Sequence, residues 1–163
     1  MNKHQLLVLG LSAAVLLTAC KKSDVAAEKQ ETLAGTEWKS VSSWSSENAE
    51  STTVYTTNLE DKGITSSIAE DGLVLVYKKS GSSITALPYE EQGESAYFWY
   101  YQVSEGSVRI HAEGGTAAQA PTAGQGFRYF IIGADTLKDL EAKGHSKAEL
   151  MTLSYENAKA LLK

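Results

Sequence analysis

The chain has one cysteine among its 163 residues. It can therefore form no internal disulfide, and it cannot gather several thiolates around a metal ion. That cysteine, Cys20, lies near the N-terminus, so the rest of the chain has no cysteine nucleophile. In an oxidising compartment a lone free thiol is a liability, which a covalent modification would remove.

Proline is also scarce, with two residues, while there are 13 glycines. The 3 tryptophans and 8 tyrosines are many for a disordered stalk and favour an ordered domain. Positive charge is in deficit, since 15 basic residues face 20 acidic ones and the net charge is −5. A nucleic-acid-binding protein needs a basic surface, so we expect no nucleic-acid partner. Repulsion also argues against adhesion to anionic headgroups.

Catalytic motifs are missing as well. The chain has no His-Glu-x-x-His, no Gly-x-Ser-x-Gly, no phosphate-binding glycine loop and no EF-hand loop. Beyond the N-terminal residues only His111 and His145 remain, too few for a structural zinc site without cysteines. We therefore expect no metal, no cofactor and no catalytic residue, and we expect that the protein is not an enzyme.

One apolar run, residues 6–17, stands out. Its 12 residues are too few for a spanning helix, which needs about 20. Lys3 precedes it, and Leu-Thr-Ala-Cys at residues 17–20 follows. A charged start, an apolar core and small residues before a cysteine are typical of a lipoprotein signal peptide. The pattern predicts a signal peptide over residues 1–19 and lipid on Cys20.

Lipidation would hold the mature chain on a membrane, because two or more acyl chains anchor a protein stably. No aspartate stands next to Cys20, which argues against retention in the inner membrane. We therefore expect an outer-membrane lipoprotein, on its periplasmic or its cell-surface side. Residues 20–33 are polar and suit a flexible tether. Residues 34–163 are long enough for one domain.

The folded part reads mainly as β-strands, with short helices after residue 134. Residues 73–77 form a continuous apolar run bounded by turn residues, which predicts a strand buried on both faces. Ile64 and Ile68 have the spacing of a helical turn. The sequence predicts strands over residues 38–41, 51–59, 73–77, 84–87, 95–103, 107–113 and 127–132.

The strongest hairpin lies on either side of Gly106, which supplies the positive φ that a tight turn needs. A two-residue loop pairs Trp99 with Ala112 and predicts that Trp99 lies in the core. The opposite face then carries a more polar set of side chains. This set consists of Phe98, Tyr100, Gln102, Arg109, His111 and Glu113.

Residues 134–163 change to a helical period. Ser146 and Glu149 form a capping box, Ser154 can cap a last helix, and Thr136 is a candidate cap for the first. The apolar stripes of these helices suit packing on a sheet. We expect a mainly β, sandwich-like single domain with short C-terminal helices.

Several segments resemble a family of small uncharacterised lipoproteins of Bacteroidota. They are Asp-Gly-Leu-Val-Leu-Val-Tyr at residues 71–77, Leu-Pro-Tyr at 87–89, Phe-Arg-Tyr-Phe-Ile-Ile at 127–132 and Ser-Tyr-Glu at 154–156. Family members often carry a proline after the Ile-Ile pair, where this chain has Gly133. The resemblance implies a fold and a cellular address, and it assigns no activity.

Three functions remain open from the residues. The leading hypothesis is a non-catalytic module that binds a glycan or an envelope protein through Phe98, Tyr100, Arg109 and His111, flanked by the small-residue loop 114–126. The alternative is a glycan hydrolase that uses the glutamates of residues 90–94, since paired carboxylates can cleave a glycosidic bond. The third is a structural lipoprotein without a ligand.

Overall fold

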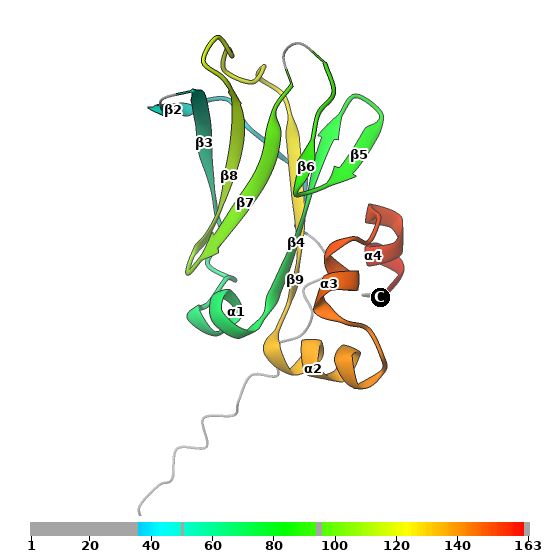
Figure 1. Cartoon of the computed structure of the whole chain (residues 1–163). Coiled ribbons are helices and arrows are strands. Elements are labelled where there is room, and N and C mark those ends of the chain that lie inside the picture. Colours follow the sequence, from blue (N-terminus) through cyan, green and yellow to red (C-terminus); the bar gives the residue numbers. More distant parts are fainter. Residues whose placement is uncertain (1–35, 50, 94–95, 162–163) are drawn as a thin grey trace, which may run out of the picture.

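The structure is a computed structural model, and it describes residues 36–49, 51–93 and 96–161. Two antiparallel sheets and four short helices build the fold (Figure 1). The four-stranded sheet contains, in spatial order, β1 (Lys39–Ser40), β9 (Gly126–Ile132), β4 (Leu73–Ser80) and β5 (Ser83–Ala86). The five-stranded sheet contains β2 (Ser45–Ala49), β3 (Thr52–Glu60), β8 (Ser107–Gly115), β7 (Phe98–Ser104) and β6 (Tyr89–Glu90). The helices are α1 (Ser66–Asp71), α2 (Ala134–Ala142), α3 (Lys147–Met151) and α4 (Tyr155–Leu161).

Strand β4 is buried on both faces, as its continuous apolar run predicted. Because side chains alternate along a strand, Val74 and Val76 point into the space between the two sheets. Leu73 and Leu75 point the other way, onto the helices. The four-stranded sheet is therefore the middle layer of the molecule.

The helical layer covers the outer face of the four-stranded sheet (Figure 1). It uses Leu137, Leu140, Leu150, Tyr155 and Ala158, all of which are buried. The capping box of Ser146 and Glu149 is present at α3. At α4 the Ser154 hydroxyl accepts a hydrogen bond from the Asn157 backbone, as expected. The mainly β, sandwich-like fold with short C-terminal helices is confirmed.

The β7–β8 hairpin has the predicted register. Trp99 lies opposite Ala112 and Val103 opposite Val108, and Gly106 has a φ of 78°. The Trp99 side chain has no exposed surface. It packs against Trp44 and Phe127 in the core between the sheets.

Several sequence-based boundaries were wrong. Strands β2 and β6 were not predicted, because β2 is a polar pentapeptide and β6 has two residues. Helix α2 begins at Ala134 after Gly133, so Thr136 is not its cap. Strand β8 runs on to Gly115, which shortens the predicted loop of residues 114–126 to residues 116–125.

A search of the described residues for a helix long and apolar enough to cross a membrane found none. The predicted signal peptide, Cys20 and most of the tether lie outside those residues.

Gly72 should not tolerate a side chain. A Cβ atom there would lie 2.7 Å from the Ile132 carbonyl oxygen and 2.8 Å from that of Ile68. Both obstacles are backbone, so we expect Gly72→Ala to lower the free energy of unfolding by roughly 1–3 kcal/mol. Urea denaturation measures this. Gly115→Ala is the matched control, since nothing lies within 4 Å of its Cβ, and it should change stability by less than about 0.5 kcal/mol. Equal effects of the two variants would contradict the packing around Gly72.

Candidate functional site

The outward side of the five-stranded sheet, called here the outer sheet face, is covered by none of the described helices or strands. Helices α2, α3 and α4 lie on the other sheet, and α1 lies at one end of the sandwich with Ile68 in the core between the sheets (Figure 1). Strand alternation and the register decide which side chains the outer sheet face carries. These are Ser45, Glu47, Val54, Thr56, Asn58, Glu60, Glu90, Phe98, Tyr100, Gln102, Ser104, Ser107, Arg109, His111 and Glu113.

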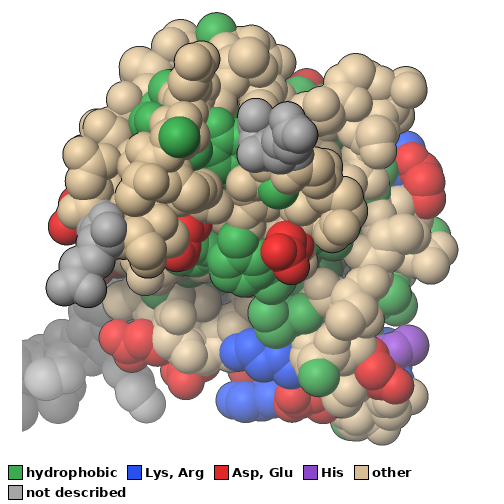
Figure 2. Space-filling view, turned by 45° about the horizontal axis from the view of Figure 1, so that its top comes forward, with side chains coloured by type: hydrophobic (Ala, Val, Ile, Leu, Met, Phe, Trp, Pro, Cys, Tyr) green, Lys and Arg blue, Asp and Glu red, His purple; other side chains and the backbone are tan. Residues whose placement is uncertain are grey.

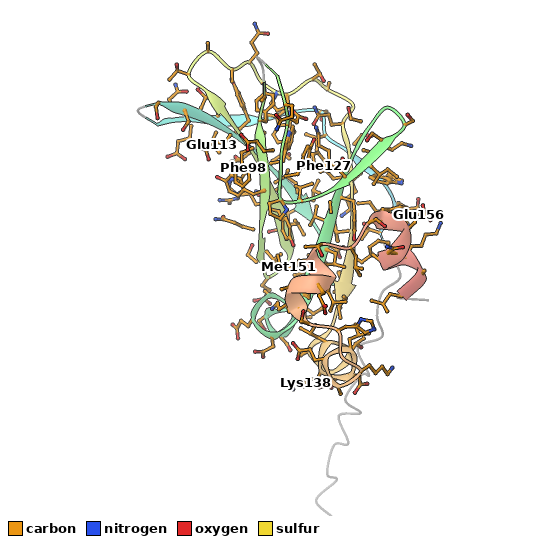
Figure 3. All side chains as sticks on the ribbon, turned by 45° about the vertical axis from the view of Figure 1, so that its right-hand side comes forward. Phe98, Glu113, Phe127, Lys138, Met151 and Glu156 are labelled. Carbon is orange, nitrogen blue, oxygen red and sulfur yellow. The ribbon has the colours of Figure 1, made fainter. Side chains whose placement is uncertain are left out.

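One cross-strand row of this face alternates carboxylates with apolar side chains. It runs from Glu47 through Val54, Glu113 and Phe98 to Glu90. The Phe98 ring thus stands directly between the two carboxylates of Glu113 and Glu90, with 45% of its surface exposed. Figure 3 shows Phe98 and Glu113 close together. Figure 2 shows hydrophobic surface with acidic side chains on either side of it.

The next row carries Thr56, His111 and Tyr100. The Tyr100 and His111 rings stack with their centroids 4.5 Å apart and their planes 8° apart. Phe98 stacks on Tyr100 with a centroid distance of 5.5 Å. Tyr100 therefore uses its ring to cover His111, and Phe98 is the aromatic ring that this face offers to solvent.

His111 lies on the predicted face, but it is not freely exposed there. It is 8% exposed, because the Tyr100 ring lies over it. Neither ring nitrogen has a hydrogen-bond partner among the described residues. Burial, together with the positive charge of Arg109, lowers the pKa of His111, so the neutral imidazole is favoured at pH 7. His111, Tyr100 and Phe98 therefore form a row of stacked rings on this face, called here the aromatic strip.

A third row carries Asn58, Arg109 and Gln102. The Arg109 Nε donates a hydrogen bond of 3.0 Å to the Asn58 side-chain oxygen, which fixes the direction of the guanidinium. A polar hollow of about 460 Å³ lies beside this pair and beside Ser45. This row therefore places the polar groups of Asn58, Arg109 and Gln102 beside the aromatic strip.

The structure brings together all four predicted surface residues, Phe98, Tyr100, Arg109 and His111, on neighbouring strands. Glu113 and Glu90 join them through the register. No group of three or more metal-binding side chains occurs in the described part of the chain. His145 lies apart from this face, in the turn between α2 and α3.

The glutamates of residues 90–94 do not form a paired site. Glu90 lies on the outer sheet face, while Glu91 points inward and receives a hydrogen bond from Lys78 at 2.6 Å. Glu91 is therefore part of a buried contact and not a free loop carboxylate. Glu94 lies outside the described residues.

Lys78 is a buried charged residue, with 2% of its side chain exposed. It donates to the Tyr89 hydroxyl at 3.0 Å, and its Nζ lies 4.0 Å from the centroid of the Trp99 ring. Burial alone would raise the pKa of Glu91, but the hydrogen bonds from Lys78 and Tyr89 and the charge of Lys78 outweigh it and lower the pKa. The cluster of Lys78, Tyr89, Glu91 and Trp99 therefore ties β4 of one sheet to the chain beside β6 of the other.

The burial of Lys78 was not predicted, although the alternation of residues along its strand indicates it. Lys78 follows Val74 and Val76 at a spacing of two, so alternation places it on the same inward face. A lysine on an inward face calls for a counter-charge, and Glu91 supplies it. Glu47 was missed because its strand was not predicted.

The Lys78–Glu91 pair should dominate the acid sensitivity of the fold. Glu91→Gln would leave the Lys78 charge buried without a counter-charge, so we expect a loss of roughly 3 kcal/mol at pH 7 by urea denaturation. The folded-state pKa of Glu91 is lowered, so its contribution is present above the unfolded-state pKa and disappears as the pH falls through the folded-state pKa. The variant should therefore lack this part of the acid-induced loss.

Glu90→Gln is the matched control, since Glu90 is an exposed neighbour on the opposite side of the strand. It should leave stability at pH 7 within about 0.5 kcal/mol of the original. Equal stabilities of the Glu91→Gln and Glu90→Gln variants would show that the buried pair contributes nothing.

Comparison with known proteins adds no identity to this geometry. The chain matches no protein-family model, no curated protein and no solved structure. The likeness to small lipoproteins of Bacteroidota, based on strand and turn motifs, therefore stays a prediction. The residues of the outer sheet face therefore provide the basis for its proposed chemistry.

Proposed function

We propose that this protein is a membrane-anchored, non-catalytic module that binds a neutral glycan on its outer sheet face. The observation that supports it best is Phe98. Its ring is 45% exposed on a sheet face that no described element covers, and it stands between the carboxylates of Glu113 and Glu90. A single exposed apolar side chain is ordinary on a protein surface, but the Phe98 ring continues into the stacked rings of Tyr100 and His111.

The chemistry of a sugar fits this arrangement. A pyranose ring has an apolar C–H face, which can lie on the Phe98 ring, and a rim of hydroxyls. The carboxylates of Glu113 and Glu90 accept hydrogen bonds from hydroxyls, and Gln102 and Arg109 donate them. An extended chain would follow the rows across the strands, because the sheet offers a long, open surface.

The charge of the face indicates which glycans it selects. Its aromatic row carries the three carboxylates of Glu47, Glu113 and Glu90, while Arg109 supplies one positive charge in the third row. Such a face repels uronic acids and sulfated sugars. Neutral polysaccharides are therefore the ligand class that we propose.

The arrangement of the glutamates supports binding without cleavage. A glycosidase holds two carboxylates on either side of one bond, about 5–10 Å apart. Glu90 and Glu91 point to opposite sides of the strand, and Glu91 is held by Lys78. They therefore cannot flank one sugar bond. This argues against a hydrolase that uses Glu90 and Glu91 as its pair of carboxylates.

The proposed anchor is lipid on Cys20 in the outer membrane, after removal of residues 1–19. Cleavage would remove one lysine and shift the net charge from −5 to −6. Such a chain gains nothing electrostatically from an anionic lipid surface, so the acyl chains would hold it there. Residues 20–33 would then act as the tether.

Binding is tested by native electrophoresis of the purified full-length protein in gels that contain dextran, barley β-glucan or galactomannan. At least one of these should retard the protein, and polygalacturonate should not. Phe98→Ala should weaken retention about tenfold, which corresponds to about 1.4 kcal/mol, because the stacking ring is lost. The double variant with Tyr100→Ala should lose retention.

Met151→Ala is the matched control, since Met151 is the second large exposed apolar residue in the part of the chain that the structure describes, with 37% exposure. It should bind as the original does. Thermal unfolding checks that the variants fold. Unchanged retention of a folded double variant would remove the outer sheet face from consideration. Release of reducing ends with turnover would show that the protein is an enzyme.

The anchor is tested by growing producing cells with labelled palmitate. The original protein should take up the label and sediment with the outer membrane, and its N-terminal residue should be Cys20. Cys20→Ser should take up no label, because the acylated thiol is missing. Ser23→Ala should behave as the original. A mature protein that begins elsewhere, or that carries no acyl chain, would refute the anchor.

A further inference from the structure

A hollow lies at the end of the sandwich where residues 116–125 connect β8 to β9, at the top of Figure 1. Its volume is about 600 Å³, within the range of about 300–1,000 Å³ found for small-ligand sites. It is lined by the two residues before β7, by the last residue of β8 and by this connecting loop. The lining includes Tyr97, Gln119, Ala120, Thr122 and Gln125.

The loop that forms the hollow is held in shape by hydrogen bonds and by close packing. The Tyr55 hydroxyl donates to the Ala118 carbonyl at 2.8 Å, and the Tyr97 hydroxyl donates to the Gln119 carbonyl. A Cβ atom on Gly114 would lie 2.6 Å from the Cβ of Ala118 and 3.1 Å from the Tyr97 ring. Glycine at this position therefore lets the loop fold back against Tyr97, and the loop forms a well-packed wall of the hollow.

The wall carries no charged side chain among its described residues. A charged ligand would lose its water there without meeting a counter-charge, which is costly. The hollow does offer one aromatic ring, from Tyr97, and the polar side chains of Gln119, Thr122 and Gln125. A neutral ligand with both hydroxyls and an apolar face matches this lining.

Gln125 also favours a ligand that carries hydroxyls. Its side-chain oxygen is buried and has no hydrogen-bond partner in the described part of the chain. An unsatisfied buried acceptor costs roughly 1–3 kcal/mol, and a ligand hydroxyl would remove that cost once the Gln125 side chain turns its oxygen toward the hollow that it lines. A purely apolar ligand would leave the oxygen unsatisfied.

We infer that this hollow is a second binding site, which takes one or two units of a neutral saccharide. It is separate from the outer sheet face. Tyr97 and Phe98 are neighbours at the start of β7, so their side chains point to opposite sides of the strand. Phe98 faces outward, while the Tyr97 ring lies 5.6 Å from the buried Trp99 ring.

The experiment is a titration of the purified full-length protein, followed by saturation-transfer NMR. The probes are cellobiose, maltose, lactose and N,N′-diacetylchitobiose, with digalacturonic acid as the charged comparison. At least one neutral disaccharide should bind, and digalacturonic acid should not. Ala120→Trp should weaken binding at least about tenfold, because Ala120 is exposed on the wall and the indole would fill the hollow. Gln125→Leu should also weaken it, through loss of the acceptor.

Ala148→Trp is the matched control, since Ala148 is an exposed alanine on α3. This variant and Phe98→Ala should bind the disaccharide as the original does. Failure of all four neutral disaccharides would overturn the inference. Binding that Phe98→Ala abolishes and Ala120→Trp leaves intact would also overturn it, and would assign the sugar to the outer sheet face. Conversely, if the original protein is retained by none of the polysaccharides but still binds a disaccharide, the outer sheet face is removed from consideration and the hollow is kept.

Discussion

The burial of Trp99 determines which side chains of β7 face the core and which face outward. Its side chain has no exposed surface, and its ring meets Trp44, Tyr97 and Phe127 at centroid distances between 5.6 and 5.9 Å. A slip of one residue would bring Trp99 to the surface and turn Phe98 inward. The cost of exposing so large a ring therefore specifies the register of β7. Phe98 and Tyr100 face outward as a consequence of it.

The buried lysine depends on the same tryptophan. Lys78 lies over the Trp99 ring and beside Glu91, so its charge is satisfied from two directions. Apolar residues of equal size in place of a buried ion pair often preserve or raise stability, so stability alone does not explain the pair. Its geometry offers another reason. A hydrogen-bonded pair helps to fix the position of β6, a strand of two residues, together with its pairing to β7 and the packing of Tyr89 against the core. That strand brings Glu90 to the side of Phe98.

Much of the fold follows from local patterns in the sequence. The two-residue turn at Gly106, the alternation along β7 and the apolar run of β4 predicted the hairpin register and both faces of the middle sheet. The capping box of Ser146 was equally local. Features that depend on distant contacts were not predictable in this way. Strand β2 has no apolar alternation and exists because β3 offers it an edge.

In the candidate site, too, local features were predictable from the sequence and features that depend on distant contacts were not. The sequence placed Phe98, Tyr100, Arg109 and His111 on one face, because the period of a strand is local. It did not give the burial of His111, which depends on the Tyr100 ring across the strand pair. It also did not give the inward turn of Glu91, which depends on Lys78 in the opposite sheet. Side-chain partners between elements are set by tertiary packing, which no local pattern contains.

The two sheets differ in what their outer faces require. The four-stranded sheet carries Leu73, Leu75 and Tyr77 outward, and these need the apolar stripes of the helices. The outer sheet face carries glutamates, hydroxyls and amides, which water satisfies, so it needs no cover. Phe98 departs from that pattern. Its ring stacks on Tyr100 and still leaves 45% of the residue exposed. The proposed glycan, with its apolar ring face, would cover the part of Phe98 that no described residue covers.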